Sequence, residues 1–307
     1  MVGCGVKPRY TPRAKQQRAF CVSPYNQIIP NTPFPNLYNS FAKPGAHMLS
    51  YRLKIWYNYP QYEKGGLHMV VRVYRYPEDV SFACALLIAA QVTQKPDSVL
   101  GLATGSSPIG TYQQLVKWHQ EGKLDFSQAI SFNLDEYAGL PESNPNSYHS
   151  FMREQLFQSI NMKASYLPNG NAKDMAEEGK RYDAQIKEKG GIDLQLLGIG
   201  RNGHIGFNEP AEDFAYGTSL VDLTPSTIDA NKRFFEKEED VPRKAISMGI
   251  GTIMEAKKIV LIAMGQDKAE AVLGAVQGKV SPGMPASILQ MHPNAVILCD
   301  EAAAGLL

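Results

Sequence analysis

The chain has 307 residues, enough for one large domain or two small ones, with the apolar and charged fractions of an ordinary globular protein. Residues 1–68 carry nine Lys and Arg and a single acid, Glu63, so this part sums to +8 and residues 69–307 to −7, within a total of +1. An acidic main body argues against nucleic acid as its general partner. The longest apolar run, residues 82–92, is too short to cross a bilayer, which argues against a membrane protein.

Four cysteines are scattered without paired spacing, at Cys4, Cys21, Cys84 and Cys299. Such usage is typical of a reducing compartment, so we expect a cytoplasmic protein. It also excludes the zinc site of nucleobase deaminases, in which two cysteines stand two residues apart. We therefore predict no metal site of this kind.

Residues 1–68 differ from the rest of the chain. They hold eight of the twenty prolines and seven of the fifteen tyrosines, and no helical or strand period persists in them. Their basic character invites interpretation as a transit peptide, although an arginine-rich amphipathic helix and a small-residue cleavage site are missing. The favoured alternative is an upstream extension of the reading frame, because Met69 immediately precedes the first convincing strand. We predict an irregular extension over 1–68 and a single folded domain over 69–307.

From Val70 onward, short apolar runs alternate with helical segments. Strands are expected at 70–74, 98–102, 129–134, 192–197, 258–264 and 295–299. Helices are expected from Pro77 to about 93, from about 109 to 121, from Ser147 to about 159, over 174–189, and from about 267 to 277. This alternation predicts βαβ units and a largely parallel sheet covered by helices on both faces.

Polar side chains follow directly after four of these expected strands. They are the hydroxyl-rich turn 104–107, Asp135, the pair His204 and Glu209, and Lys268. The carboxyl ends of parallel strands share one edge of the sheet, and ligands bind in the crevice there. We therefore expect these groups to meet in one site.

The glycine-rich segment 198–210 offers three interpretations. Its spacing Gly-x-Gly-x-x-Gly, with Asp222 further on, matches a dinucleotide-binding fingerprint, but that motif must open a helix, and Gly206, Asn208 and Pro210 disfavour one. The segment could also be a structural turn with a surface histidine. We favour a catalytic loop, because histidine as a residue type titrates near neutrality and Glu209 can fix the tautomer of His204, with Asn202 as an amide partner.

The turn after the second strand predicts a phosphate site, with hydroxyls, free backbone N–H groups and a helix dipole contributed by Thr104, Gly105, Ser106 and Ser107. It lacks the Gly-Lys-Ser/Thr ending of a nucleotide-binding loop, so a sugar phosphate fits better than ATP. Lys268 and Arg233 could add positive charge. The alternatives are an ordinary N-capped turn and two solvated surface cations.

Asp135 ends a strand beside Glu136. Successive strand side chains point to opposite faces, so at most one of the two carboxylates faces the site. A partly shielded carboxylate has the proton affinity that a general base needs. The alternative is an aspartate that caps the loop at 137–139.

These motifs occur together and in order, and the chain resembles the glucosamine-6-phosphate deaminase family, also called the glucosamine-6-phosphate isomerase family, over residues 69–302. The motifs are Gly101–Pro108, Phe132–Tyr137, Gly203–Pro210, Arg233–Phe235, Met248–Thr252, Lys268-Ala269 and Leu289–Pro293. The resemblance implies a Rossmann-like three-layer α/β/α domain with a mostly parallel sheet. It also implies the conversion of glucosamine 6-phosphate and water to fructose 6-phosphate and ammonia, as in amino-sugar catabolism, without an organic cofactor or catalytic metal.

The resemblance also implies roles for individual residues. His204 would open the sugar ring with Glu209 paired to it, and Asp135 would move a proton between C2 and C1. The phosphate would be held by Thr104–Ser107, Lys268 and Arg233.

Two departures from the family limit this transfer of roles. Asn202 stands where some members carry Asp, and an amide cannot raise the proton affinity of the imidazole as a carboxylate does. Members activated by N-acetylglucosamine 6-phosphate carry a serine and two basic residues where this chain has Glu212, Ser219 and Val221. We therefore expect no such activation, and we leave the subunit number open because monomeric and hexameric relatives share the core motifs.

Two rival functions remain. A 6-phosphogluconolactonase has the same fold and a Gly-His loop, but its loop continues differently. A sensor of sugar phosphates would need the pocket without the proton-transferring groups Asp135, His204 and Glu209.

Overall fold

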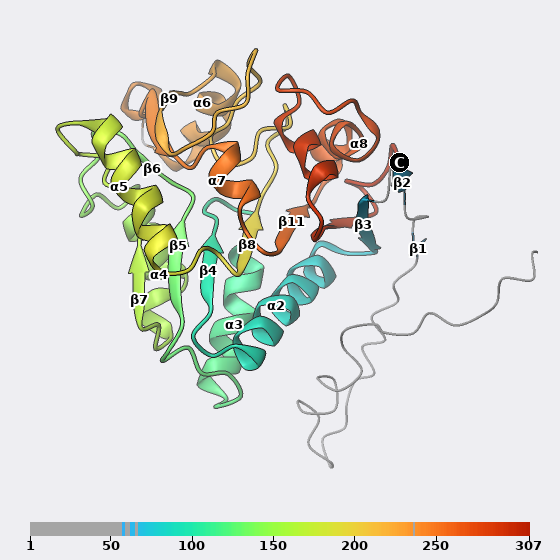
Figure 1. Cartoon of the computed structure of the whole chain (residues 1–307), viewed down its shortest axis with the longest axis horizontal. Coiled ribbons are helices and arrows are strands. Elements are labelled where there is room, and N and C mark those ends of the chain that lie inside the picture. The colour runs from blue at the N-terminus through green and yellow to red at the C-terminus, as the bar shows by residue number, and fades with distance from the viewer. Residues whose placement is uncertain (1–56, 59–61, 65–66, 236) are drawn as a thin grey trace, which may run out of the picture. The chain divides into compact units, whose positions relative to one another are not determined.

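The computed structural model describes residues 57–58, 62–64, 67–235 and 237–307 (Figure 1). Most of the predicted extension over 1–68 therefore lies outside the described residues. The first long strand, β3 (Leu67–Tyr74), begins slightly earlier than expected. Two short strands, β1 (Tyr57–Asn58) and β2 (Tyr62–Lys64), pair with it in antiparallel fashion. The domain boundary at residue 68 remains a prediction.

Seven parallel strands form the main sheet, and β1 and β2 add antiparallel pairing to β3. The parallel strands follow the order β3, β12 (Ala295–Asp300), β11 (Ile259–Ala263), β8 (Leu194–Leu197), β4 (Val99–Leu102), β5 (Ile130–Asn133) and β7 (Ala164–Tyr166). Every residue of the central strands β11, β8 and β4 is buried. Burial on both faces explains why these strands read as continuous apolar runs without alternation.

Helices connect and cover the parallel strands, which gives the predicted three-layer α/β/α arrangement. They are α2 (Pro77–Gln94), α3 (Ile109–Gln120), α4 (Tyr148–Gln155), α5 (Met175–Glu188) and α8 (Ala269–Gln277). Their bounds lie within a few residues of those expected from the sequence. Side chains cap the N-termini of two of these helices, because those of Ser147 and Asp174 accept hydrogen bonds from backbone N–H groups in the first turns of α4 and α5.

A second, three-stranded antiparallel sheet was not predicted. It consists of β6 (Asp135–Tyr137), β10 (Lys244–Ser247) and β9 (Ser219–Asp222). The short helices α6 (Pro225–Asn231) and α7 (Ile250–Met254) follow β9 and β10 in the chain. Figure 1 shows β9 and α6 together at the top of the view, and α3 near the bottom of the part formed by residues 67–307. This sheet matters for the site because its first residue is Asp135.

At the other edge of the main sheet, where the strands begin, one buried carboxylate ties several elements together. Asp193 lies just before β8 and accepts hydrogen bonds from Lys95 Nζ at 2.6 Å and Lys257 Nζ at 2.8 Å. It also accepts one from the backbone N–H of Val99, the first residue of β4, at 2.8 Å. Asp193 is 5% exposed, so these bonds replace the water that burial removes.

Candidate active site

The four polar segments predicted to meet do follow four adjacent strands. In the order β11, β8, β4 and β5, the strands are succeeded by Lys268, by the glycine-rich loop, by the turn 104–107 and by Asp135. Because these strands are parallel neighbours, their carboxyl ends form one continuous edge. The expectation of a single edge is confirmed.

The glycine-rich loop is not the start of a helix. Residues 198–210, all of them described, form turns and an isolated bridge between Ile205 and Asn208. Gly203 and Gly206 adopt φ values of 83° and 57°, a region that residues with a Cβ atom seldom enter. The dinucleotide-binding interpretation is therefore wrong, because a phosphate-binding helix terminus is missing from this loop.

His204 and Glu209 are paired within this loop. His204 Nδ1 lies 3.3 Å from Glu209 Oε2, and their side chains are 19% and 10% exposed. Asn202 Nδ2 donates to the same Glu209 oxygen at 2.7 Å, and Asn202 Oδ1 accepts from the backbone N–H of His204 at 3.3 Å. The amide of Asn202 thus touches both members of the pair.

The surroundings of Glu209 favour its ionised form. Burial by itself raises the pKa of this carboxyl, but the hydrogen bond and charge of His204, with the hydrogen bonds of Thr227 and Asn202, lower the pKa to about 2. Glu209 is therefore a carboxylate at neutral pH. A carboxylate in this position stabilises the protonated imidazole and fixes the tautomer of the neutral one.

Asp135 and Glu136 point to opposite sides of β6, as alternation requires. Glu136 turns to the N-terminus of α4, where its oxygens accept from the backbone N–H groups of Tyr148 and His149, each at 3.0 Å. His149 Nδ1 lies 2.7 Å from the same carboxylate. Glu136 Oε1 also accepts from the backbone N–H of Tyr137 at 2.8 Å, so the capping role considered for Asp135 at 137–139 belongs to Glu136.

Asp135 faces the glycine-rich loop. An ideal Cβ atom built on Gly206 would lie 3.7 Å from Asp135 Oδ2 and 3.1 Å from the hydroxyl oxygen of Ser247. Ser247 lies opposite Asp135 in the β6–β10 pairing and accepts from the backbone N–H of Phe207 at 3.0 Å. The second carboxylate and the loop that carries His204 are thus in direct proximity, with no packed core between them.

The surroundings of Asp135 favour its protonated form, whereas those of Glu209 favour its ionised form. Asp135 is 5% exposed, and burial, followed by the negative charge of Glu136, raises its pKa to about 8. Such a carboxyl can both take up and release a proton near neutrality. That property is required of a base that must give back the proton it removes.

The turn after β4 keeps the features expected of a phosphate site. Gly105 has φ 87°, and the N-cap position of α3 is held by Pro108, whose side chain makes no capping hydrogen bond. The N-terminal N–H groups of α3 are therefore not capped by that side chain. The turn also adjoins the glycine-rich loop, since an ideal Cβ on Gly198 would lie 4.0 Å from Ser107 Cβ.

One predicted cation, Arg233, lies beside this turn, and the other, Lys268, lies close enough to Arg233 for the charge of Arg233 to act on it. Arg233 Nη2 donates to Ser106 Oγ at 3.1 Å, although the two residues are 127 positions apart in the chain. Burial, together with the neighbouring charges of Arg201 and Arg233, lowers the pKa of Lys268 against the opposing effect of Asp267. The electrostatic repulsion between neighbouring cations is offset when an anion binds between them.

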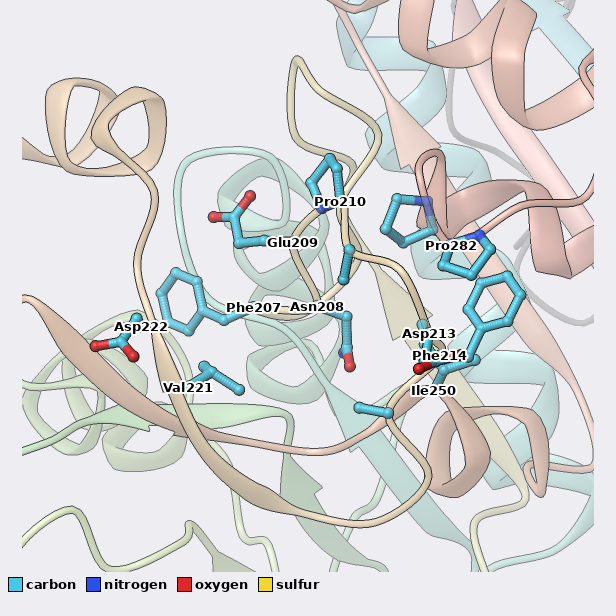
Figure 2. A pocket seen from close by; sticks show the side chains of 13 residues that line it. Phe207, Asn208, Glu209, Pro210, Asp213, Phe214, Val221, Asp222, Ile250 and Pro282 are labelled. Carbon is cyan, nitrogen blue, oxygen red and sulfur yellow. The ribbon is translucent and has the colours of Figure 1, made fainter.

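A cavity of about 240 Å³ lies beside Glu209. Figure 2 shows Phe207 and Val221 on one side of it and Phe214 and Pro282 on the other. Its lining includes Glu209 but not Asp135, His204 or the turn 104–107, so this cavity is distinct from the site outlined above. Among the described residues that line it, none is a lysine or arginine, and its charged groups are all acids.

Several site residues were missed by the sequence analysis. Thr227 on α6 donates a short hydrogen bond to Glu209 Oε1, and Ser247 lies between Asp135 and the loop. The hydroxyl of Tyr148 interacts with Thr104, and its ring stacks with Phe207 at 6.2 Å between centroids. The Thr-Pro-Ser-Thr run at 224–227, a helix start with Pro in the first turn, was a usable signal for α6.

Within the described part of the chain, no group of three or more His, Cys, Asp or Glu is arranged to hold a metal ion. No described helix is both long enough and apolar enough to cross a membrane.

Comparison with known proteins places these features in context. A family model described as glucosamine-6-phosphate isomerases/6-phosphogluconolactonase matches residues 78–298. Glucosamine-6-phosphate deaminase of Clostridioides difficile (strain 630) is 53% identical over 232 residues, which cover 75% of this chain and 93% of that protein. The deaminase of Lachnoclostridium phytofermentans is 56% identical over 223 residues, covering 72% and 94%.

Solved structures give the same result at the level of the fold. A monomeric glucosamine-6-phosphate deaminase superposes with a TM-score of 0.76 at 46% identity, covering 77% of this chain and 99% of that one. The 6-phosphogluconolactonase of Trypanosoma brucei superposes with a TM-score of 0.60 at 19% identity, covering 78% and 99%. The second likeness concerns the fold alone.

Proposed function

Because the chain belongs to the glucosamine-6-phosphate isomerase/6-phosphogluconolactonase family, we propose how its site residues carry out the reaction of its deaminase relatives. The protein is an enzyme that converts glucosamine 6-phosphate and water to fructose 6-phosphate and ammonia. The reaction combines an aldose–ketose isomerisation with the loss of an amino group. The steps are proton transfers, the addition of water and the departure of ammonia, and the site holds groups suited to the proton transfers.

Ring opening is assigned to His204. The hemiacetal must lose the proton of its C1 hydroxyl while the ring oxygen gains one, and an imidazole near neutrality can move a proton between the two oxygens. Glu209, ionised and 3.3 Å from Nδ1, stabilises the imidazolium that forms during this transfer. Asn202 donates to the same oxygen of Glu209 and helps to hold the carboxylate in place.

Isomerisation is assigned to Asp135. Its carboxylate takes the proton from C2 of the open-chain sugar and returns it to C1. The C1 oxygen gains a proton and the nitrogen loses one, so that the C–N bond at C2 becomes an imine. Water adds to this imine carbon and ammonia leaves, which gives the ketone of fructose 6-phosphate. A base with a pKa raised to about 8 holds the proton long enough to deliver it to the neighbouring carbon.

Phosphate binding is assigned to the turn of Thr104, Gly105, Ser106 and Ser107, with Arg233 and Lys268. The phosphate is remote from C1 and C2, so its binding energy serves to orient the reacting end of the sugar. The hydrogen bond between Arg233 and Ser106 supports this role, because it brings a cation from a distant segment to the turn.

The observation that carries the proposal is the proximity of Asp135 Oδ2 to Gly206, within the loop that pairs His204 with Glu209. An assay of ammonia release from glucosamine 6-phosphate tests it, with fructose 6-phosphate measured in parallel. We expect equimolar products. Hydrolysis of 6-phosphogluconolactone without ammonia release from the amino sugar would instead favour the lactonase activity.

We further propose that N-acetylglucosamine 6-phosphate does not activate the enzyme. The cavity beside Glu209 contains Val221 from the stretch where activated members carry basic residues, and Asp213 and Asp222 line it as well. Acidic walls disfavour an anionic effector. Initial rates at subsaturating substrate, measured with and without the effector, test this, and a clear gain in substrate affinity would contradict it.

We also propose a cytoplasmic location, whereas the subunit number stays open. A monomeric relative has been solved, but subunit number varies within the family, so sedimentation of the purified full chain is the direct measurement.

A further inference from the structure

Glu209 is held by groups at both of its oxygens. Oε2 is shared by Asn202 and His204, which belong to the same loop as Glu209. Oε1 accepts from the hydroxyl of Thr227, which lies on the separate helix α6 and is only 4% exposed. The contact between Thr227 and Glu209 therefore depends on how α6 packs.

The hydrogen of the Thr227 hydroxyl has one evident direction. Thr224 Oγ1 donates to Thr227 Oγ1 at 3.3 Å, so Thr227 acts as an acceptor there and directs its own proton to the carboxylate. A hydroxyl that accepts one hydrogen bond and donates another to an anion forms a polarised chain, which strengthens the bond to the anion. This chain fixes the plane of the Glu209 carboxylate.

We propose that Thr227 is a positioning residue of the active site, which orients Glu209 toward His204 through its hydroxyl. The inference rests on the proposed role of the His204–Glu209 pair in ring opening. Thr227 does not touch the reacting atoms in this account. It sets the angle at which the Glu209 carboxylate faces Nδ1 of His204.

The segment that carries Thr227 also contacts the proposed phosphate site. Arg233 follows six residues later in the same segment and donates to Ser106 in the phosphate turn. Phe235, two residues after Arg233, packs edge-on against Tyr137 at 5.9 Å between ring centroids. One stretch of chain therefore contacts the proposed phosphate site and the partner of the catalytic histidine.

The test compares Thr227→Val, which keeps the shape and removes the hydroxyl, with Thr227→Ser, which keeps the hydroxyl. Thr218→Val is the matched control, because Thr218 is a buried threonine whose hydroxyl also donates to a carboxylate, Asp183, at 2.6 Å, outside the site. For each variant, kcat and KM for glucosamine 6-phosphate are measured together with the urea midpoint.

We expect Thr227→Val to lower kcat by about ten- to a hundredfold, the range for one hydrogen bond to a charged group. KM should change little, because the phosphate-binding groups are intact. Thr227→Ser should restore most of kcat, and Thr218→Val should alter stability without altering kcat.

Three results would overturn the inference: unchanged kcat in Thr227→Val, equal losses in the Val and Ser variants, or a loss matched by Thr218→Val. Glu209→Gln, measured alongside, separates this inference from the proposal on which it rests. If Glu209→Gln retains full turnover, the role of the pair itself is wrong. If Glu209→Gln is impaired and Thr227→Val is not, only the role of Thr227 is wrong.

Discussion

Two carboxylates of the same site have their pKa values shifted in opposite directions, and the cause is their immediate surroundings. Glu209 is surrounded by donors, from His204, Asn202 and Thr227, and its pKa falls to about 2 although burial opposes this. Asp135 is buried beside the negative charge of Glu136, and its pKa rises to about 8. The site thus contains one carboxylate that stays charged and one that exchanges its proton, a division of roles seen in many acid–base enzymes.

Strand β6 places Asp135 and Glu136 on opposite faces. Glu136 accepts hydrogen bonds from the N-terminus of α4, while Asp135, one residue earlier, faces the glycine-rich loop. Alternation along the strand puts the charge that tunes Asp135 on the other face, where it cannot take part in the chemistry itself. Each variant below removes one side of this contrast.

The largest expected effect belongs to Asp135→Asn. The amide cannot accept the C2 proton, so kcat for ammonia release should fall by between about a hundredfold and ten-thousandfold. Asp193→Asn is the control, since Asp193 is equally buried, at 5% exposure, but lies at the opposite edge of the sheet. If both variants lose turnover equally, the loss reflects folding and not proton transfer.

The next effect is that of Glu209→Gln, which removes the permanent charge beside His204. We expect kcat to fall about a hundredfold, and more than in Asn202→Ala, where only one of the hydrogen bonds to Glu209 is lost. Steady-state turnover of the two variants measures the difference. Equal losses would show that the amide of Asn202 is as important as the carboxylate.

The ionised forms of the two carboxylates should have opposite effects on the free energy of unfolding. The folded-state pKa of Asp135 is raised from 3.8 to about 8, so stability falls as pH rises through this window and the carboxyl ionises in the core. At pH 9, Asp135→Asn should therefore be more stable than the unmodified protein, on the order of a few kcal/mol. The advantage should disappear at acidic pH, where Asp135 is protonated.

Glu209 gives the opposite result. The pKa of Glu209 is lowered from 4.5 to about 2 on folding. Its ionised carboxylate therefore stabilises the folded protein fully above pH 4.5, and this stabilisation is lost as the pH falls to about 2. Glu209→Gln should destabilise the protein at neutral pH by about 1–3 kcal/mol. Urea unfolding of both variants at several pH values checks the pair, and shifts of the same sign would refute the contrast.

The smallest effect is on the pH profile. Because Asp135 must be ionised to remove the C2 proton, kcat/KM should rise with pH through about 8. In Glu136→Gln one of the two causes of the raised pKa is removed, so the rising limb should move to lower pH. The comparison variant is His149→Asn, which removes the contact of the His149 ring nitrogen with Glu136 but leaves the negative charge of Glu136 in place. If the rising limb of the kcat/KM profile stays at the same pH in Glu136→Gln, burial alone raises the pKa of Asp135.

The parallel sheet and its helices were predictable because the signals were local. Continuous apolar runs at 192–197 and 258–264, and the caps Ser147 and Asp174, each indicate an element without reference to distant residues. The meeting of Asp135, His204 and Lys268 followed from the rule that parallel strands share an edge. These parts of the site depend on topology alone.

The small antiparallel sheet and the role of Thr227 were not predictable in this way. Strand β9, with half of its residues partly exposed and half exposed, lacks an apolar run, and β6 is only three residues long. The contact of Thr227 with Glu209 joins residues 18 positions apart through the packing of α6, which no local pattern encodes. The division of labour between Asp135 and Glu136 likewise needed the position of α4.

The buried aspartate at the start of β8 has a practical consequence. Asp193 joins Lys95, Lys257 and the beginning of β4 on the side of the sheet away from the sugar. Since the reacting groups all stand beyond the opposite ends of the strands, heat tolerance can be altered around Asp193 while the rate of ammonia production is left as it is. An engineer seeking a longer-lived catalyst would begin there.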